Sequence, residues 1–476
     1  MFIGRDQELS DLAGLWQKRS SSLVVCSGRR RIGKSTLIEE FAARSRCKFI
    51  EIAGLAPDEG ITNAHQLRNF CERLAAQTGM PEARVDGWPK AFDALFSAVG
   101  TRGRVIVLLD EVSWMGAFDK GFAAYLKNAW DLLFARRDNL VFVLCGSVSS
   151  WIRKNILMSK AFVGRVSMTL HLEELPLPVC AGFWGNAAER ISTTELVDIL
   201  SVTGGVPKYL AEIRPSLSAG ENIRRLCFTK TGYLFGEFER IFTDIFRKTA
   251  DERGRMLELI ADGPKSVKSL SAALGVASNG HVSEALNELC EAGFISADNG
   301  LNPATAREVR EVHYRIRDNY VRFYLKFIRP RLRAIENGSL GTVDVFGLPG
   351  WNSIAGLQFE CLVRNNLSLL LPLIGMGATV VTSAAPYVKR SGKRGEGTQI
   401  DLLVQTSRSA CIVEIKRQER IPATVEDEVR AKVKKLALPD ELSIRTALVY
   451  SGKLAPEIAE SNYFDFLVPI ERLLNR

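Results

Sequence analysis

Histidine is scarce in this sequence, and cysteine is scattered. The chain has four histidines, none at the spacing of a zinc site, so zinc chemistry is not expected. Its nine cysteines include no C-x-x-C pair, which argues against a metal-binding or redox motif. Cys26, Cys145 and Cys411 lie inside apolar runs. We therefore expect buried, reduced thiols and a cytoplasmic protein.

Long hydrophobic runs are also missing. The longest apolar stretch, residues 367–381, is broken by Pro372, Gly375 and Gly377, and it is short for a membrane span. The first ten residues contain no apolar segment of the kind found in secretory signals. We expect no membrane partner, and we interpret residues 367–381 as buried core.

The length and the charge allow several kinds of function. A chain of 476 residues can hold roughly two to four domains. Its formal net charge of +9 is compatible with a polyanionic partner, although many solvated surfaces carry a similar excess. Charge alone therefore does not decide whether the protein binds nucleic acid.

A phosphate-binding loop is predicted near the N-terminus. Residues 21–27 form a short, valine-rich apolar run typical of a buried parallel strand, and residues 36–44 have helical spacing. The segment between them reads Gly28-x-x-x-x-Gly33-Lys34-Ser35. Glycines allow the backbone to approach phosphate closely, while the lysine reaches the β- and γ-oxygens and the serine hydroxyl binds Mg²⁺. The alternative is a glycine-rich turn without a ligand.

A second strand supplies the carboxylates that such a site needs. The apolar run 105–109 ends in Asp110 and Glu111. Asp110 would hold the magnesium through water, and Glu111 would orient or deprotonate the attacking water. Alternatively, these acids merely end a strand.

Two further residues are candidates in this region. The strand predicted over residues 140–147 ends at Ser147, which would sense the γ-phosphate or cap the next helix. Arg165 comes just before another predicted strand. It would serve as an arginine finger, in its own chain or toward a neighbour, or it is an ordinary surface arginine.

Six segments occur in an order that resembles a known family. They are FIGRDQEL at 2–9, GRRRIGKSTL at 28–37, LLDEVSWM, LCGSVSSWI, the Gly-Arg pair at 164–165 and TGGVPKYL at 203–210. Together they resemble the archaeal-type ATPases, a branch of the AAA+/STAND-like P-loop proteins, over roughly residues 1–235. The resemblance implies that the leading Phe-x-Gly-Arg box lies over adenine and that a helical lid contains Pro207. The expected nucleotide contacts are Phe2, Gly4, Arg5, Gly28, Arg29, Arg30, Arg31, Ile32, Gly33, Lys34, Ser35, Thr36, Ser147 and Pro207.

The middle of the chain favours a small helical domain. Residues 210–250 are expected to be helical, and three short helices with a strand pair follow from residue 251, a pattern typical of a winged helix-turn-helix. The third helix carries Glu284, Glu288 and Glu291, and acids facing phosphates are unfavourable. Packing or regulation is therefore preferred to DNA reading. The aromatic and basic segment 314–333 is either a buried stripe with solvated cations or a surface that follows a nucleic-acid backbone.

The last 130 or so residues carry a second group of charged residues. Glu360 lies on a predicted helix, Asp401 opens a strand, and Glu414 and Lys416 share one side of the next strand. Carboxylates could bind Mg²⁺ for attack on a phosphodiester, with Glu360, Asp401 and Glu414 as ligands, and the lysine could polarise the nucleophile. A salt-bridged strand pair and an inactive nuclease fold remain alternatives.

This arrangement resembles the PD-(D/E)xK nucleases, in particular the nuclease-like domain found fused to archaeal-type ATPases, over roughly residues 345–476. The turn before Asp401 carries four cations, which either grip phosphates or are inert. They are Lys389, Arg390, Lys393 and Arg394.

These observations predict a multidomain fold. It comprises an α/β P-loop NTPase core (1–180), a helical lid (181–250), an α winged helix-turn-helix with a bridging segment (251–335) and an α/β PD-(D/E)xK nuclease-like domain (345–476). The predicted function is ATP binding and hydrolysis coupled to a metal-dependent nuclease. ATP and Mg²⁺ are the expected cofactors, with Mn²⁺ as an alternative ion at the nuclease-like site. DNA is preferred to RNA as partner, and self-association is left open. The alternative is an ATP-controlled regulatory or DNA-binding scaffold with an inactive nuclease-like domain.

Overall fold

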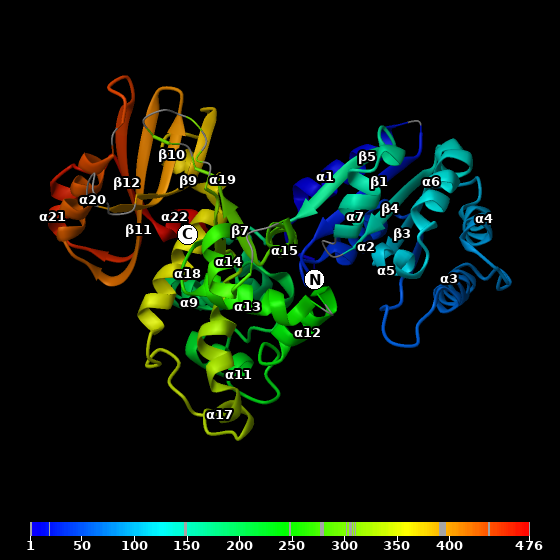
Figure 1. Ribbon diagram of the computed structural model, residues 1–476, viewed down its shortest axis with the longest axis horizontal. Helices are drawn as coiled ribbons and strands as arrows, with labels where there is room; N and C mark the ends of the chain where they lie inside the picture. The colour runs from blue at the N-terminus through cyan, green and yellow to red at the C-terminus, as the bar shows by residue number, and fades with distance from the viewer. Residues whose placement is uncertain are drawn as a thin grey trace. The chain divides into compact units, whose positions relative to one another are not determined.

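The computed structural model describes residues 2–18, 20–146, 150–246, 249–276, 280–300, 302–303, 307, 309, 311–389, 397–436 and 438–475. The chain forms two compact units, Met1–Leu175 and Pro176–Arg476 (Figure 1), and each is described by itself. Across the described ranges, no helix combines the length and the apolar composition needed to cross a bilayer. All nine cysteines carry free thiols.

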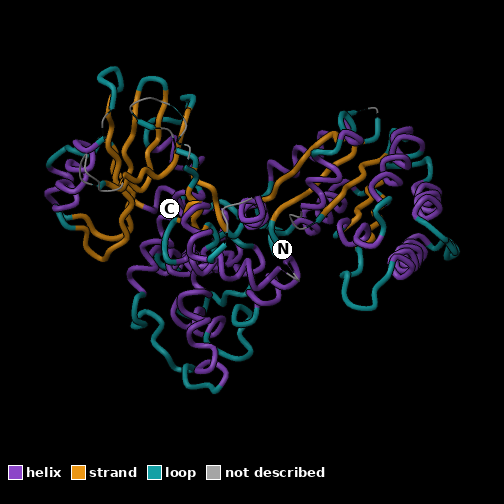
Figure 2. Tube along the Cα trace, viewed as in Figure 1, coloured by secondary structure: helices purple, strands orange, loops and turns teal. Residues whose placement is uncertain are grey.

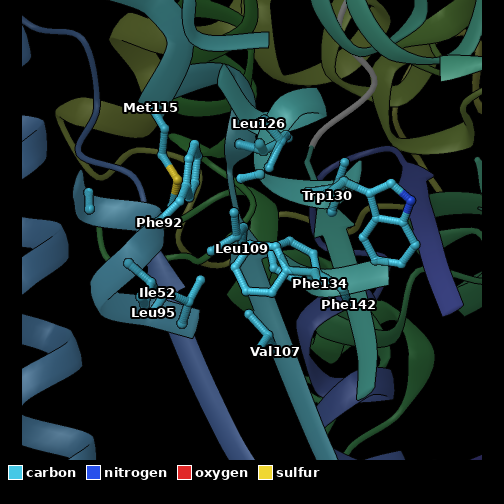
Figure 3. Packing of buried hydrophobic residues seen from close by; sticks show 14 of the residues in the cluster. Ile52, Phe92, Leu95, Val107, Leu109, Met115, Leu126, Trp130, Phe134 and Phe142 are labelled. Carbon is cyan, nitrogen blue, oxygen red and sulfur yellow. The ribbon is translucent and has the colours of Figure 1, made fainter. Parts of the chain in front are cut away.

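The first unit is built on a five-stranded parallel sheet of order β2-β3-β4-β1-β5. Figure 2 shows its strands in orange and the helices beside them in purple. The predicted strands are confirmed, and alternate strand residues enter different hydrophobic clusters, so both faces of the sheet are buried. Figure 3 shows the cluster that contains Val107, Leu109 and Phe142. Helices α3, α4 and α6 pack on this side, and helices α1 and α2 contribute to the other cluster. The strands are β1 (Ser22–Gly28), β2 (Lys48–Ala53), β3 (Val105–Asp110), β4 (Leu140–Cys145) and β5 (Val166–Leu172). The α-helices are α1 (Asp6–Gly14), α2 (Lys34–Ser45), α3 (Asn63–Thr78), α4 (Trp88–Val99), α5 (Val112–Met115), α6 (Phe122–Leu132) and α7 (Ser150–Ile152).

The second unit begins with short helices rather than one long one. The prediction of continuous helix over residues 210–250 is wrong, because Ser218 and Glu221 form a capping box that starts a new helix and a non-helical segment follows Phe228. The helices are α8 (Leu177–Cys180), α9 (Thr193–Thr203), α10 (Pro207–Leu210), α11 (Ala219–Cys227) and α12 (Glu237–Phe246).

Three helices and three antiparallel strands follow, in the order helix, strand, helix, helix, strand, strand. The second helix is capped by Ser266, whose hydroxyl accepts from the amide of Ser269, and it stops at Gly275 with a φ of 70°. The elements are α13 (Ala250–Ala261), β6 (Lys265–Ser266), α14 (Val267–Leu274), α15 (Gly280–Glu291), β7 (Ile295–Asp298) and β8 (His313–Ile316). Two short helices, α16 (Asn319–Phe323) and α17 (Leu332–Glu336), continue the chain.

The remaining residues form a mixed sheet with helices. The strand order is β13-β12-β11-β10-β9. Strand β10 pairs antiparallel with β9 and with β11, whereas β11 with β12 and β12 with β13 are parallel pairs. Helix α18 contacts β11, while α20 and α21 contribute to a hydrophobic cluster with the sheet. The elements are α18 (Trp351–Asn365), α19 (Leu367–Leu373), β9 (Val381–Lys389), β10 (Thr398–Thr406), β11 (Ser409–Ile421), α20 (Thr424–Lys435), β12 (Ser443–Leu454), α21 (Pro456–Glu460), β13 (Phe466–Pro469) and α22 (Ile470–Leu474).

Candidate functional sites

The predicted phosphate-binding loop joins β1 to α2, at the carboxyl end of the parallel sheet. Gly28 and Gly33 have φ values of 147° and 87°, and Arg31 between them adopts the left-handed conformation with a φ of 68°. A Cβ atom on Gly28 would lie 2.5 Å from the carbonyl oxygen of Leu172. The loop therefore needs glycine at this position both for its backbone angle and for its packing.

Lys34, Ser35 and Asp110 meet at this loop. The ammonium of Lys34 donates to the carbonyl oxygens of Gly28 and Arg29, each at 3.0 Å. The hydroxyl of Ser35 donates to the Asp110 carboxylate at 2.6 Å. The two side chains predicted to hold Mg²⁺ thus lie in direct contact, although they are 75 residues apart in the sequence.

Glu111 follows at the tip of β3 in the left-handed conformation, with a φ of 47°. Its carboxylate lies at the carboxyl end of the neighbouring strand, because a Cβ on Gly146 would be 3.9 Å from Glu111 Oε2. The strand ends therefore bring this acid to the same edge of the sheet as Asp110. Ser147 lies outside the described residues.

The other predicted nucleotide contacts lie on several elements of the two units. Arg29 pairs with Glu174 at 3.4 Å, and the Arg30 guanidinium lies 5.3 Å from the ring centre of Trp114. Arg5 donates to the carbonyl oxygen of Ile32 and so connects the leading box to the loop. Gly4 precedes Arg5 in a left-handed turn, Phe2 packs against the core, Thr36 is exposed on α2 and Pro207 starts α10 in the second unit. Their contacts with nucleotide stay predictions.

Arg165 lies at the amino-terminal ends of the parallel strands, opposite the ends that carry the loop. It precedes β5, whose first residue Val166 pairs with Leu23 at the start of β1, whereas the loop follows the end of β1. Its guanidinium donates two hydrogen bonds to the Asp131 carboxylate, at 2.6 and 2.8 Å. These bonds lower the pKa of that carboxyl to about 2. The strand between the two edges spans roughly 20 Å. A role at the phosphate site of its own chain is therefore not supported, and a role toward a neighbouring chain stays a prediction.

The four charged residues predicted in the C-terminal region converge. Glu360 on α18, Asp401 on β10, and Glu414 and Lys416 on β11 all line one hollow of about 580 Å³. β10 and β11 are antiparallel neighbours, and the amide of Ile415 donates to the Asp401 carboxylate at 2.9 Å. One detail differs from the prediction: Asp401 is the fourth residue of its strand, which begins at Thr398.

In two of these residues, burial and neighbouring negative charge disfavour the ionised carboxylate. Burial, followed by the charge of Glu414, raises the pKa of Asp401 to about 6. Burial and the charge of Asp401 raise the pKa of Glu360 to about 7, and the nearby guanidiniums of Arg364 and Arg322 oppose this rise. Repelling carboxylates in a cleft are a frequent mark of a functional site, because a bound cation relieves the repulsion.

Glu414 is only 1% exposed and is already neutralised by lysines. Lys432 on α20 donates to both of its oxygens at 2.8 and 2.6 Å, and Lys416 lies at 3.0 Å. Among the described residues, no group of three or more Asp, Glu, His or Cys side chains is arranged to hold a metal. The oxygen donors suit a divalent ion chemically, but the lysine contacts would have to open first.

Lys432 did not emerge from the sequence motifs. It belongs to an apolar stripe of α20, since Val425, Val429 and Leu436 around it are buried. A lysine at a core position of a helix is the sequence signal that would have identified it. The basic turn before Asp401 cannot be placed in the same way, because only Lys389 of its four cations lies within the described residues, on β9.

Several charged side chains of the middle segment pair with one another. Glu288 of α15 bonds the buried Arg253 at 3.0 and 3.1 Å, so this acid packs against α13. In the segment 314–333, Tyr320, Phe323 and Tyr324 are buried. Two of its cations pair with acids, Lys326 with Asp262 and Arg329 with Glu258. A buried stripe with paired cations is therefore the correct description of this segment.

Comparison with known proteins identifies the N-terminal region. Residues 2–213 match a family described as an ATPase domain predominantly from Archaea. This match covers a little under half of the chain. It extends into α9 and α10 of the second unit.

Individual proteins are also similar to this chain. The uncharacterized protein MJECL04 of Methanocaldococcus jannaschii is 22% identical over 417 residues, which cover 87% of each chain. The uncharacterized ATP-binding protein MJ0423 of the same organism is 38% identical over 52 residues, 11% of this chain and 88% of that protein. The Walker-type ATPase paby2304 of Pyrococcus abyssi has the same fold with a TM-score of 0.52 and 17% identity, covering 68% of this chain and 96% of that one.

Proposed function

We propose that the chain binds ATP at the β1–α2 loop and hydrolyses it. The observation that carries this proposal is the direct 2.6 Å contact between Ser35 and Asp110 beside Lys34. Ser35 and Asp110 would hold Mg²⁺, which supplies charge stabilisation to the β- and γ-phosphates. Lys34 would bind the same phosphates. Glu111, at the neighbouring strand tip, would orient the attacking water and accept its proton.

Three variants test this assignment in the full chain. Lys34→Ala is expected to abolish ATP binding, and Glu111→Gln to bind ATP but turn it over at least about 100-fold more slowly. Lys18→Ala is the control, because this exposed lysine precedes β1 at the other end of the strand. Binding is measured with labelled ATP and turnover as phosphate release. Equal ATP affinity in Lys34→Ala and Lys18→Ala would exclude the site.

We propose further that the C-terminal sheet is a PD-(D/E)xK-type nuclease acting on DNA. The supporting observation is the convergence of Glu360, Asp401, Glu414 and Lys416 on one hollow. Asp401 and Glu414, with Glu360, would hold a divalent ion, which supplies an activated water and neutralises the scissile phosphate. Lys416, whose ammonium lies 3.0 Å from Glu414, would polarise the nucleophile.

The neighbouring segment supports the same architecture. The element order from α13 to β8 supports our assignment of a winged helix to this segment. Because Glu288 is engaged with Arg253, we assign this winged helix to packing or regulation rather than base reading. ATP hydrolysis would reset its contacts with the nuclease-like domain.

Cleavage assays distinguish this function from its rival. The full chain is incubated with single- and double-stranded DNA and with RNA, in Mg²⁺ or Mn²⁺. Asp401→Asn should lose cleavage while keeping ATP turnover, and the exposed Asp440→Asn should change neither. If wild type cuts none of these substrates under any condition, the C-terminal domain only binds. ATP then controls a regulatory or DNA-binding scaffold.

A further inference from the structure

Lys432 lies where a helix would ordinarily place an apolar residue. It follows Val425 by seven residues and Val429 by three, and it precedes Leu436 by four. These three neighbours are buried, and their spacing is that of one helix face. This spacing directs Lys432 toward β11 rather than toward solvent. Its contact with Glu414 is therefore built into the packing of α20 and is more than a surface ion pair.

The contact neutralises the most buried acid of the hollow. Glu414 is 1% exposed, and Lys432 donates to both of its oxygens at 2.8 and 2.6 Å. The same ammonium also acts favourably on the charge of Asp401. Lys432 thus supplies at Glu414 the positive charge that a divalent ion bound there would supply.

The two lysines beside Glu414 differ in their other partners. Lys416 also reaches Glu428, at 3.2 Å, so it keeps an acidic partner if Glu414 is taken by a cation. For Lys432, Glu414 is the sole acid in hydrogen-bonding contact within the described parts of the chain. Once released from Glu414, its ammonium would need another anion in the hollow.

We infer that Lys432 is a positioning residue of the C-terminal site, which holds Glu414 in the metal-free protein and turns to a backbone phosphate of the nucleic acid when a divalent ion binds Glu414. This inference rests on the proposed nuclease function. The chemistry is consistent, because an ammonium that has lost a carboxylate finds an equivalent anion in a phosphate oxygen. The binding of metal and of nucleic acid is then coupled. The metal frees Lys432 to contact the phosphate, and the phosphate keeps Lys432 away from the carboxylate that binds the metal.

The inference predicts two opposite changes for Lys432→Met, which keeps an unbranched side chain, one atom shorter, and removes the charge. Without the competing ammonium, Mn²⁺ should bind at least about tenfold more tightly. In the presence of Ca²⁺, used to prevent cleavage, a DNA duplex should bind more weakly, by about fivefold or more. A structural brace alone would predict no gain in metal affinity.

The test uses the full chain without nucleotide, and free Mn²⁺ is followed by electron paramagnetic resonance. Lys434→Met is the matched control, since it removes a lysine from the same helix turn at an exposed position outside the hollow. Lys432→Gln is measured in parallel, so that the test survives if the methionine variant fails to fold.

The possible outcomes separate the inference from the proposed function. Tighter Mn²⁺ binding in the Lys432 variants, but not in Lys434→Met, supports the inference. Equal or weaker binding than wild type overturns it and leaves the nuclease site intact. If neither wild type nor the Lys432 variants bind Mn²⁺ in a manner that Asp401→Asn abolishes, the metal site itself fails, and the inference fails with it.

Discussion

Arg417 donates a hydrogen bond to the carboxylate of Asp198, and both side chains are largely buried. Arg417 is the residue after Lys416 on β11, while Asp198 lies in α9, within the segment that matches the ATPase domain family. The pair therefore joins that segment to the strand that carries the candidate nuclease residues. Burial raises the pKa of Asp198 to about 6 even though the charge of Arg417 opposes the rise.

Replacing Arg417 with leucine should show how much its charge stabilises the buried Asp198 carboxylate. Arg417→Leu leaves a buried carboxylate without its cation, and we expect the free energy of unfolding to fall by about 3 kcal/mol at pH 8. Because the folded-state pKa of Asp198 lies above its ordinary value of 3.8, the folded protein holds the extra proton and stability falls as the pH rises through about 6. The loss of unfolding free energy should thus be smaller at pH 5.

Urea denaturation at both pH values measures this loss. Arg420→Leu, an exposed change on the same strand, is the control, and an equal loss at pH 5 and pH 8 would contradict the account.

The two glycines of the phosphate-binding loop should differ in their tolerance of alanine. A Cβ on Gly28 would meet the Leu172 carbonyl oxygen at 2.5 Å, whereas nothing lies within 4 Å of one on Gly33. We expect Gly28→Ala to lower the free energy of unfolding by about 3 kcal/mol, through overpacking and backbone strain together. Gly33→Ala should cost about 1–2 kcal/mol from its backbone angle alone. Thermal and urea unfolding without nucleotide would decide the matter, and an equal cost at the two positions would refute the steric argument.

Arg165 should be dispensable for hydrolysis by an isolated chain. Its guanidinium is engaged with Asp131 at the edge of the sheet opposite the loop. We expect Arg165→Ala to keep the wild-type turnover per chain at low protein concentration. A deficit that grows with concentration would show that the residue acts on a neighbouring chain. The measurement is ATP turnover over a range of protein concentrations, with sedimentation to follow association. A loss of activity at the lowest concentrations would disprove our placement of this residue.

Local patterns explain why much of the first unit could be predicted. The β1 strand, its glycine loop and α2 follow directly from an apolar run, the Gly28 and Gly33 spacing and a helical period. The position of Asp110 and Glu111 near the loop follows because parallel strands end at one edge of the sheet. Similarly, the convergence of Asp401 and Glu414 follows from two adjacent strands joined by a short turn.

The features that were missed depend on contacts between distant elements. Lys432 meets Glu414 only because α20 packs on the sheet, and Asp198 meets Arg417 only in the folded second unit. The apolar spacing of α20 places Lys432 on the buried side of the helix, but it does not identify the residue that Lys432 contacts. The helix predicted over residues 210–250 failed for a local reason: the Ser218 cap starts α11 within a segment whose composition alone favours helix.

Asp401 should destabilise the protein when no cation is present. Its folded-state pKa is about 6, against an ordinary value of 3.8, so the folded form binds more protons between these values and stability falls as the pH rises through them. Asn at this position keeps an oxygen to accept from the Ile415 amide and removes the charge. We therefore expect Asp401→Asn to be more stable than wild type at pH 8, on the order of 1–3 kcal/mol, and about equal near pH 4.

Divalent ions should reverse the order of stability of wild type and Asp401→Asn. Without nucleotide, millimolar Mn²⁺ should raise the melting temperature of wild type, because it binds the folded state, and leave Asp401→Asn unchanged. Differential scanning calorimetry at pH 8, with and without Mn²⁺, measures both effects, and Asp440→Asn controls for a general change in charge. An Asp401→Asn variant that is less stable than wild type at pH 8 in the absence of metal would mean that Asp401 serves the fold. In that case the repulsion among Glu360, Asp401 and Glu414 would no longer argue for a cation site.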